Sequence, residues 1–264
     1  MATQNRMYVP THPGEAGNIK IKSLAVPIED GITAFLAANG IAALFNKNTW
    51  PIVGGGGTYT SGQWNITTTG TGAAAAEATT PGGGILITTG STSTFNTDLS
   101  SKQVWTPVAD KYIAFAARIQ VSHATQIGFD LGITNSQADP QTTDFTDSIE
   151  FRKAVGGATV VGRVRGDSGT AASTSTLLTM TAATEYEIGF YAKLNATAGN
   201  CQGSWFVGVT GGPYTETAFT ANQRAQLARI LTTPPSFAFN LSGKGTTGVN
   251  PTMTVTAALL QADN

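Results

Sequence analysis

The feature that most constrains the fold is an alternation of apolar and polar residues across residues 112–134. Every second residue is apolar from 113 to 121, and the alternation resumes from 127 to 133 after a short polar break. Successive side chains of a strand point to opposite faces, so a period of two predicts two β-strands, each with one buried face. Because the break is short, we expect the two strands to be antiparallel neighbours.

The same alternation recurs in most of the chain that follows. It predicts strands at 149–152, 158–165, 185–193, 204–210, 237–241 and 253–259. Turn signals separate them every 8–12 residues, and about eleven strands in this rhythm predict a two-sheet sandwich or a barrel. Residues 70–83 consist mainly of glycine, alanine and threonine, and we expect a long loop there.

One segment departs from the strand rhythm. Thr220 and Gln223 have the spacing of a capping box, and apolar residues at 227, 230 and 231 would share one helical face. Pro234 and Pro235 then stop any helix. The sequence therefore predicts a short helix over 220–231.

Charge excludes two classes of partner. Charged residues make up 12% of the chain and the net charge is −1, so no strong field attracts nucleic acid or an anionic membrane. No stretch approaches the ~20 apolar residues of a membrane span. A surface with so little charge is poorly protected against association, which suggests a protein that works inside an assembly. The single cysteine, Cys201, excludes an intramolecular disulfide.

Residues 1–57 differ from the rest and are predicted to be an N-terminal arm for assembly, with residues 58–264 forming the sandwich domain. The arm lacks an apolar signal segment, so we expect synthesis in a cytoplasm. Residues 29–48 have roughly helical spacing, which predicts one or two short helical segments. Its apolar side chains are candidates for contact with a neighbouring subunit: Ile32, Phe35, Leu36, Leu44, Phe45 and Trp50.

No pattern of catalytic residues emerges. His12 and His123 lack metal-ligand spacing and are interpreted as surface residues. Glu185 and Glu187 have the two-residue spacing that would place paired carboxylates on one face of a strand, as a glycosidase requires. A solvated strand face explains them better. We therefore predict no enzymatic activity and no cofactor.

An acidic loop gives a weak indication of a metal site. Asp139 and Asp144 lie within it, and Asp147 follows it. Carboxylate oxygens of this kind could bind a hard cation such as Ca²⁺, although EF-hand spacing is absent. An ordinary acidic surface loop is the alternative.

Aromatic rings are the other candidate binding groups, because exposed rings can form a carbohydrate platform. The available rings are Trp50, Trp64, Trp105, Trp205, Tyr191 and Tyr214. Trp64, Trp105 and Trp205 lie in strand patterns and are therefore expected in the core.

Residues 111–261 resemble the concanavalin A-like (laminin-G-type) jelly-roll domains of tailed-bacteriophage virion proteins. The resemblance rests on AFAARIQVS followed by QIGFDLGIT, then DSIEFRK, EYEIGFYAKL, GSWFVGVTGG and PPSFAFNL. It implies an all-β, two-sheet antiparallel jelly-roll sandwich. The metal-binding and catalytic residues of the lectin and glucanase members have no clear counterparts here.

The resemblance implies a capsid decoration (cement) protein on the surface of a phage head. Its partners would be the major capsid protein and copies of itself, with a trimer expected from the threefold positions of a capsid lattice. The alternative is a glycan-binding adhesin of a tail or head fibre, which would recognise a host-surface glycan. An endoglycanase that uses Glu185 or Glu187 ranks third.

Overall fold

The computed structural model describes residues 7–10, 18–21, 41–45, 53–54, 57–61, 64–77, 84–91, 96–135, 145–167, 171–232 and 237–262. The strands of one large sheet, the back sheet, are β3 (Ile41–Phe45), β4 (Val53–Gly54), β7 (Ala73–Glu77), β8 (Ile85–Thr89), β10 (Tyr112–Val121), β15 (Glu185–Lys193), β16 (Gln202–Val209), β17 (Thr215–Ala218) and β19 (Thr252–Ala262). Those of the front sheet are β5 (Gly57–Ser61), β6 (Trp64–Thr69), β9 (Asn96–Trp105), β11 (Gly128–Thr134), β12 (Ser148–Lys153), β13 (Thr159–Arg165), β14 (Ser173–Thr179) and β18 (Phe237–Lys244). The remaining elements are the strands β1 (Met7–Pro10) and β2 (Asn18–Ile21), the 3-10 helix η1 (Ala198–Asn200) and the helix α2 (Ala221–Ile230).

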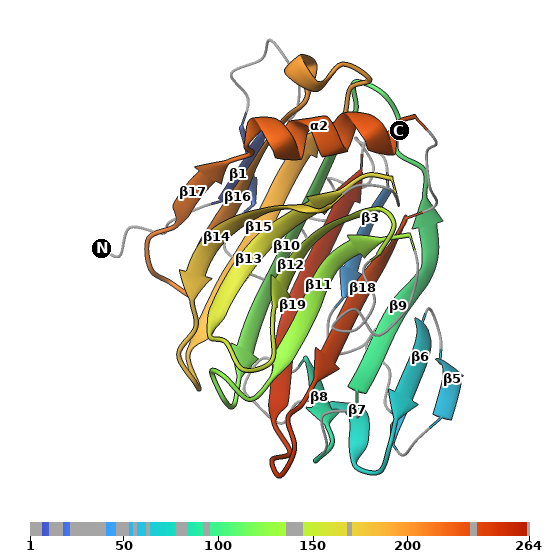
Figure 1. Ribbon diagram of the computed structural model, residues 1–264, viewed down its shortest axis with the longest axis vertical. Coiled ribbons are helices and arrows are strands. Elements are labelled where there is room, and N and C mark those ends of the chain that lie inside the picture. The colour runs from blue at the N-terminus through green and yellow to red at the C-terminus, as the bar shows by residue number, and fades with distance from the viewer. Residues whose placement is uncertain are drawn as a thin grey trace.

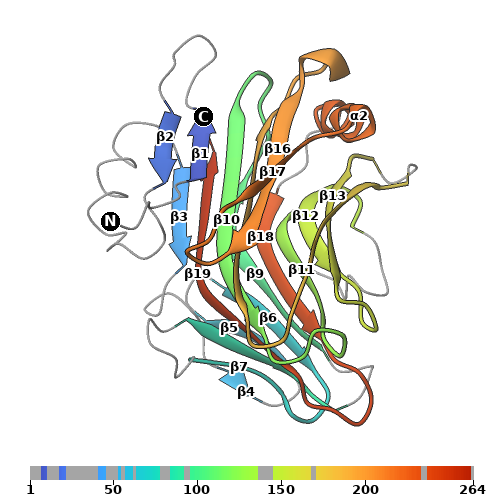
Figure 2. The same cartoon turned by 90° about the vertical axis from the view of Figure 1, so that its left-hand side faces the viewer.

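The two large sheets form a sandwich. The back sheet has the order β17-β16-β15-β10-β19-β8-β7-β4, with β3 also paired to β19, and the front sheet has the order β14-β13-β12-β11-β18-β9-β6-β5. Neighbouring strands in both are antiparallel. Figure 1 looks onto the front sheet, and Figure 2 shows the two sheets side by side. The predicted two-sheet antiparallel sandwich is confirmed.

Aromatic side chains from both sheets meet in the core. Phe115 on β10 lies 6.3 Å from Phe151 on β12, and Phe151 packs edge-on against Trp205 on β16 at 5.0 Å between ring centroids. Phe190 contacts the same rings. Burying each such ring contributes ~1.5–3 kcal/mol, so this cluster is a principal link between the sheets. The predicted core position of Trp205 is confirmed.

The two strands of the opening alternation lie in different sheets. β10 pairs with β15 and β19 in the back sheet, whereas β11 pairs with β12 and β18 in the front sheet. The short polar break between them is therefore a crossover between sheets, and the prediction of antiparallel neighbours is wrong. The apolar period fixes which face of a strand is buried, but it does not select the strand's partner.

Helix α2 spans residues 221–230, as its capping signal predicts. The Thr220 hydroxyl accepts a hydrogen bond from the Gln223 backbone N–H, and the Gln223 side chain accepts one from the Thr220 backbone N–H. Its buried face carries Leu227 and Ile230, which join the core. The helix lies across one end of the sandwich (Figure 1).

Two segments differ from the sequence prediction. Residues 73–77, expected within a long loop, form β7 between β4 and β8, with Ala73 and Ala75 fully buried. Residues 41–45, expected to be helical, form β3 and pair with residues 258–262 of β19. Alanine gives little polar contrast, so neither AAAAE nor IAALF reveals a period. β8 covers only residues 252–255 of β19, which leaves the rest of that edge open for β3.

The hairpin β1–β2 forms a sheet of its own on the side of the back sheet away from the front sheet (Figure 2). Ile32, Phe35, Leu36 and Trp50 lie outside the described residues. Leu44 and Phe45 lie in β3, so their predicted helical setting is wrong. Their contact with a neighbouring subunit stays a prediction, as does the domain division at residue 57. Among the described helices, none has the length and apolar character needed to cross a membrane.

Candidate ligand-binding faces

The outer face of the back sheet gathers residues from three consecutive strands. Phe206 on β16 stands opposite Gly189 on β15, which in turn stands opposite Ala116 on β10. In the next row, Arg118 on β10 stands opposite Glu187 on β15. All of these residues alternate with core residues and therefore point away from the sandwich core.

Three rings meet on this face. The rings of Tyr191 and Phe206 lie 5.8 Å apart, and Tyr214 packs against the same small cluster. Gly208 makes room for Tyr214, because a Cβ at that position would lie 3.1 Å from the Tyr214 ring and 2.6 Å from the Pro213 carbonyl oxygen. Tyr191 and Tyr214 are half-buried, so each presents part of its ring to the surface.

A charged group adjoins the rings. Arg118 donates to the Glu187 carboxylate from both Nε, at 3.2 Å, and Nη2, at 2.5 Å. Glu185 lies 3.5 Å from the same guanidinium and accepts a hydrogen bond from Thr256. The side chain of Glu185 is 32% exposed, whereas that of Glu187 is 4% exposed. The three rings and these three charged residues together are called the outer patch: Arg118, Glu185, Glu187, Tyr191, Phe206 and Tyr214.

The solvated strand face predicted for Glu185 and Glu187 is wrong for Glu187. Its carboxylate is buried in an ion pair with Arg118, and a group held in this way is poorly placed to pass a proton to a substrate. Arg118 comes from a strand far away in the sequence, so the alternation around Glu187 could not reveal the pairing. The two carboxylates therefore belong to a structural ion-pair group.

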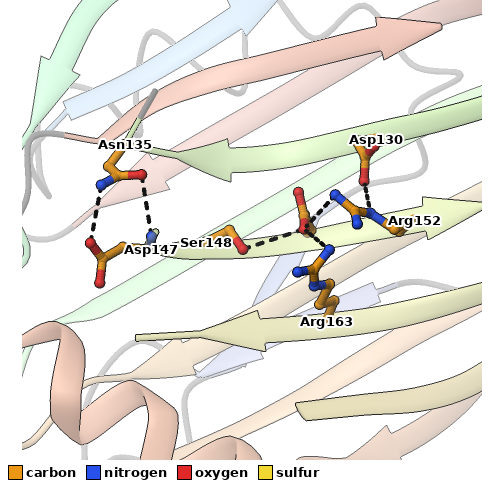
Figure 3. A network of polar contacts seen from close by, with 7 residues as sticks. Asp130, Asn135, Asp147, Ser148, Arg152 and Arg163 are labelled. Atoms are coloured by element: carbon orange, nitrogen blue, oxygen red, sulfur yellow. Dashed lines mark hydrogen bonds and ion pairs between the residues drawn. The ribbon is translucent and has the colours of Figure 1, made fainter. Parts of the chain in front are cut away.

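The outer face of the front sheet carries a second network, drawn in Figure 3. Arg152 donates to Asp130 at 2.6 Å. Arg152 and Arg163 also approach the Glu150 carboxylate at 3.7 and 3.6 Å, and Ser148 donates to it at 3.3 Å. Glu150 alternates with the core residues Ile149 and Phe151 and therefore points away from the core, yet it is completely buried.

Burial makes Glu150 an unusually weak acid. Loss of water contact, together with the charge of Asp130, raises its pKa to about 8, and Arg152 and Arg163 oppose the shift. Its Oε2 atom has no hydrogen-bond partner among the described residues. With this pKa Glu150 is mostly protonated at neutral pH, so two guanidinium groups accompany the Asp130 carboxylate and the network has the wrong charge to attract a divalent cation.

The candidate calcium ligands are only partly described. Asp139 and Asp144 lie outside the described residues. Asp147 accepts a hydrogen bond from the Asn135 side chain at 3.1 Å (Figure 3). It accepts another from the Asp167 backbone N–H at 2.9 Å, so the residue before β12 is tied to two loops. Burial raises the pKa of Asp147. The described residues contain no cluster of three or more potential metal-ligating side chains.

The other predicted candidates have separate settings. His123 is exposed and contacts Ser122, whereas His12 lies outside the described residues. Trp64 and Trp105 lie at the ends of β6 and β9. Cys201 is buried, its thiol donates to the Asn195 carbonyl oxygen, and burial raises its pKa, so it is not an activated nucleophile.

Comparisons with known proteins define the fold. No protein family and no curated protein sequence matches the chain. Lectin II from Ulex europaeus matches 86% of this chain over 100% of its own, with 11% identity and a TM-score of 0.55. Peanut lectin matches 85% of this chain over 98% of its own, with 12% identity and a TM-score of 0.52. The chain therefore has the lectin-like, concanavalin A-like jelly-roll fold.

Proposed function

We propose that this protein is a glycan-binding protein without enzymatic activity, and that the outer patch of the back sheet is its binding surface. The observation that carries the proposal is the meeting of Tyr191, Phe206 and Tyr214 beside a charged hydrogen-bonding group. A sugar ring has an apolar face and a rim of hydroxyl groups. Half-buried aromatic rings match the apolar face, and the partly exposed Glu185 carboxylate can accept hydrogen bonds from the hydroxyls.

The rigidity of the patch supports the proposal further. Its residues project from hydrogen-bonded strands, and Arg118 is held by two carboxylates. A surface held in this way loses little conformational freedom when a ligand binds. The lectin-like fold is consistent with this role, although the fold by itself does not assign one.

A glycan array with the full-length protein tests the proposal. We expect binding to at least one neutral saccharide, and we expect Tyr191→Ala and Tyr214→Ala each to weaken it about tenfold, or ~1.4 kcal/mol. Val209→Ala is the matched control, since this exposed side chain lies on β16 but points to the opposite side from Phe206. An empty array, or unchanged binding in both tyrosine variants, would contradict the proposal.

The absence of catalysis has its own test. Incubation of the protein with the bound polysaccharide should release no reducing sugar, because Glu187 is held by Arg118. Release of reducing ends that is lost in Glu187→Gln would show an endoglycanase instead.

A second proposal is a capsid decoration protein at the virion surface, which binds the major capsid protein and copies of itself as a trimer. The hairpin β1–β2 supports it, because within the described residues its strands pair only with each other. A two-stranded hairpin is marginal in water and needs a surface to pack against, which a neighbouring subunit could supply. Imaging of labelled particles would locate the chain. Capsid binding that survives deletion of residues 1–40 would contradict an anchoring arm.

A further inference from the structure

We infer that the outer patch selects glycans that carry a protonated amine and disfavours glycans that carry carboxylate or sulfate groups. This inference rests on the proposed glycan site and adds a ligand class to it. The reasoning depends on which charges share the outer face of the back sheet and on which of them a ligand can reach.

Among the described strand residues on this face of the back sheet, carboxylates outnumber cations. Glu185, Glu187 and Glu216 lie around the rings, and Arg118 is the cation between them. At the far end of the face, Lys193 pairs with Asp110 at 3.3 Å. Among these six residues, four carboxylates and two cations leave a net charge of −2.

Both cations are already engaged by carboxylates. The side chain of Arg118 is 10% exposed and contacts Glu187 and Glu185, so it is a poor partner for an anionic ligand. The side chain of Lys193 is 14% exposed. Hydrogen bonds from Asn195 and from Lys193 lower the pKa of Asp110, which keeps that partner ionised.

The carboxylates that a ligand can reach lie next to the rings. Glu216 on β17 stands directly opposite Phe206 on β16 and is exposed. Glu185 is partly exposed at the other end of the charged group. A saccharide stacked on Tyr191 and Tyr214 would therefore extend between two acidic groups. An ammonium substituent on its rim would be attracted, and an acidic substituent would be repelled.

The test compares three oligosaccharides of equal length: an amino-sugar oligomer, its N-acetylated form and a uronate oligomer. Their binding to the full-length protein would be measured by calorimetry at a pH at which the amine is protonated. Exposed ion pairs are weak, so we expect the amine form to bind only about fivefold more tightly than the acetylated form. The uronate should bind most weakly. Added salt should reduce the difference, because it screens exposed charges.

Variants separate charge from stacking. Glu216→Gln should remove part of the preference for the amine, and Glu216→Asp should restore it because the charge is kept. Tyr214→Ala should weaken binding of all three oligomers. A polylysine peptide of equal charge should bind weakly and should not respond to Tyr214→Ala.

The outcomes that overturn the inference are distinct from failure of the proposed function. Equal binding of the amine and acetylated forms, or tighter binding of the uronate, overturns the charge preference and leaves a glycan site in place. Binding of polylysine as tight as the amino-sugar oligomer also overturns it, since charge alone would then explain the result. If none of the oligomers binds and the glycan array is empty, both proposals fail.

Discussion

At the scale of single residues, the least expected feature is Glu150. This glutamate lies on the outer face of the front sheet, away from the core, and is nevertheless fully buried. The pKa of Glu150 is about 8 in the folded protein, whereas the ordinary glutamate pKa is 4.5. The folded state therefore binds the carboxyl proton of Glu150 more tightly than the unfolded state does. The stabilisation that comes from this tighter proton binding is complete below pH 4.5 and is lost as the pH rises through about 8. The free energy of unfolding should therefore fall by a few kcal/mol over this range, at ~1.4 kcal/mol per unit of pKa shift.

Glu150→Gln should abolish most of this pH dependence, because the amide resembles the protonated acid. Urea unfolding at several pH values between about 5 and 9 would measure the change, because most of the shift in the pKa of Glu150 lies within this range. Burial also raises the pKa of Asp147, so this residue contributes to the pH dependence in the same direction. Glu216→Gln removes an exposed carboxylate and serves as control; an equal effect in both variants would argue against a special role for Glu150.

Lys153 has the opposite behaviour. Its side chain is completely buried on the core side of β12 and donates to the Ile127 carbonyl oxygen, and burial lowers its pKa to about 8. The unfolded state binds more protons between pH 8 and 10.5, so stability rises with pH in that interval and the cost of burial is complete below it.

Lys153→Met should consequently raise the free energy of unfolding at neutral pH by ~1 kcal/mol, since it removes a buried charge and keeps the volume of the side chain. The gain should shrink as the pH rises from about 8 through 10.5, above which the wild-type amine is mostly neutral in both states. A loss of stability at neutral pH would show that the hydrogen bond to Ile127 outweighs the buried charge.

At the scale of elements, α2 is held by polar side chains as well as by its apolar face. Gln223 completes the capping box, donates to the Gly162 carbonyl oxygen of β13 and accepts from Ser175 of β14. Gln226 accepts from the Gly166 backbone N–H and donates to the Ala171 carbonyl oxygen. The helix is thereby joined to the front sheet and to the segment that links β13 with β14.

Thr220→Ala should cost about 1 kcal/mol of stability, the usual value for a lost N-cap. Gln223→Ala should cost more, about 2–3 kcal/mol, because it also leaves the buried Gly162 carbonyl oxygen without this donor. Denaturant unfolding of both variants measures the difference. Equal losses would mean that the bonds from Gln223 to the front sheet contribute little.

Strand prediction succeeded where apolar and polar residues alternate and failed where they do not. The segments around β12, β13, β15 and β16 have clear contrast, and their pairing into two hairpins follows from the short turns. β3 and β7 lack contrast. In the outer patch, the rings of Tyr191 and Tyr214 could be recognised as candidates, but Phe206 could not, because its strand position gave no sign of the tyrosines beside it.

At the scale of the whole molecule, two short strands of the predicted N-terminal arm lie in the back sheet. β3 and β4 belong to the back sheet by their hydrogen bonds to β19 and β7, so part of residues 1–57 completes the sandwich. Deletion of residues 1–40 should leave the thermal midpoint within a few degrees of the full chain. Deletion of residues 1–57 should lower it clearly, because β19 then loses a partner strand. Equal midpoints for the two deletions would support a domain boundary at residue 57.

The charged clusters on the two outer faces also follow from the whole arrangement. Arg118 meets Glu187, and Asp130 meets Arg152, only because the strand order places β10 beside β15 and β11 beside β12. Such partners depend on the sheet topology, which a single sequence does not reveal. This explains why the fold could be predicted while the burial of these charges could not.

The position of β19 has a consequence for biosynthesis. This last strand lies inside the back sheet and joins β10 to β8 and β3. Until it leaves the ribosome, the two halves of that sheet have no common strand, and their edges are open to other nascent chains. Closure of the back sheet must therefore wait for the synthesis of β19, and a chain truncated before residue 252 could not complete this sheet by folding.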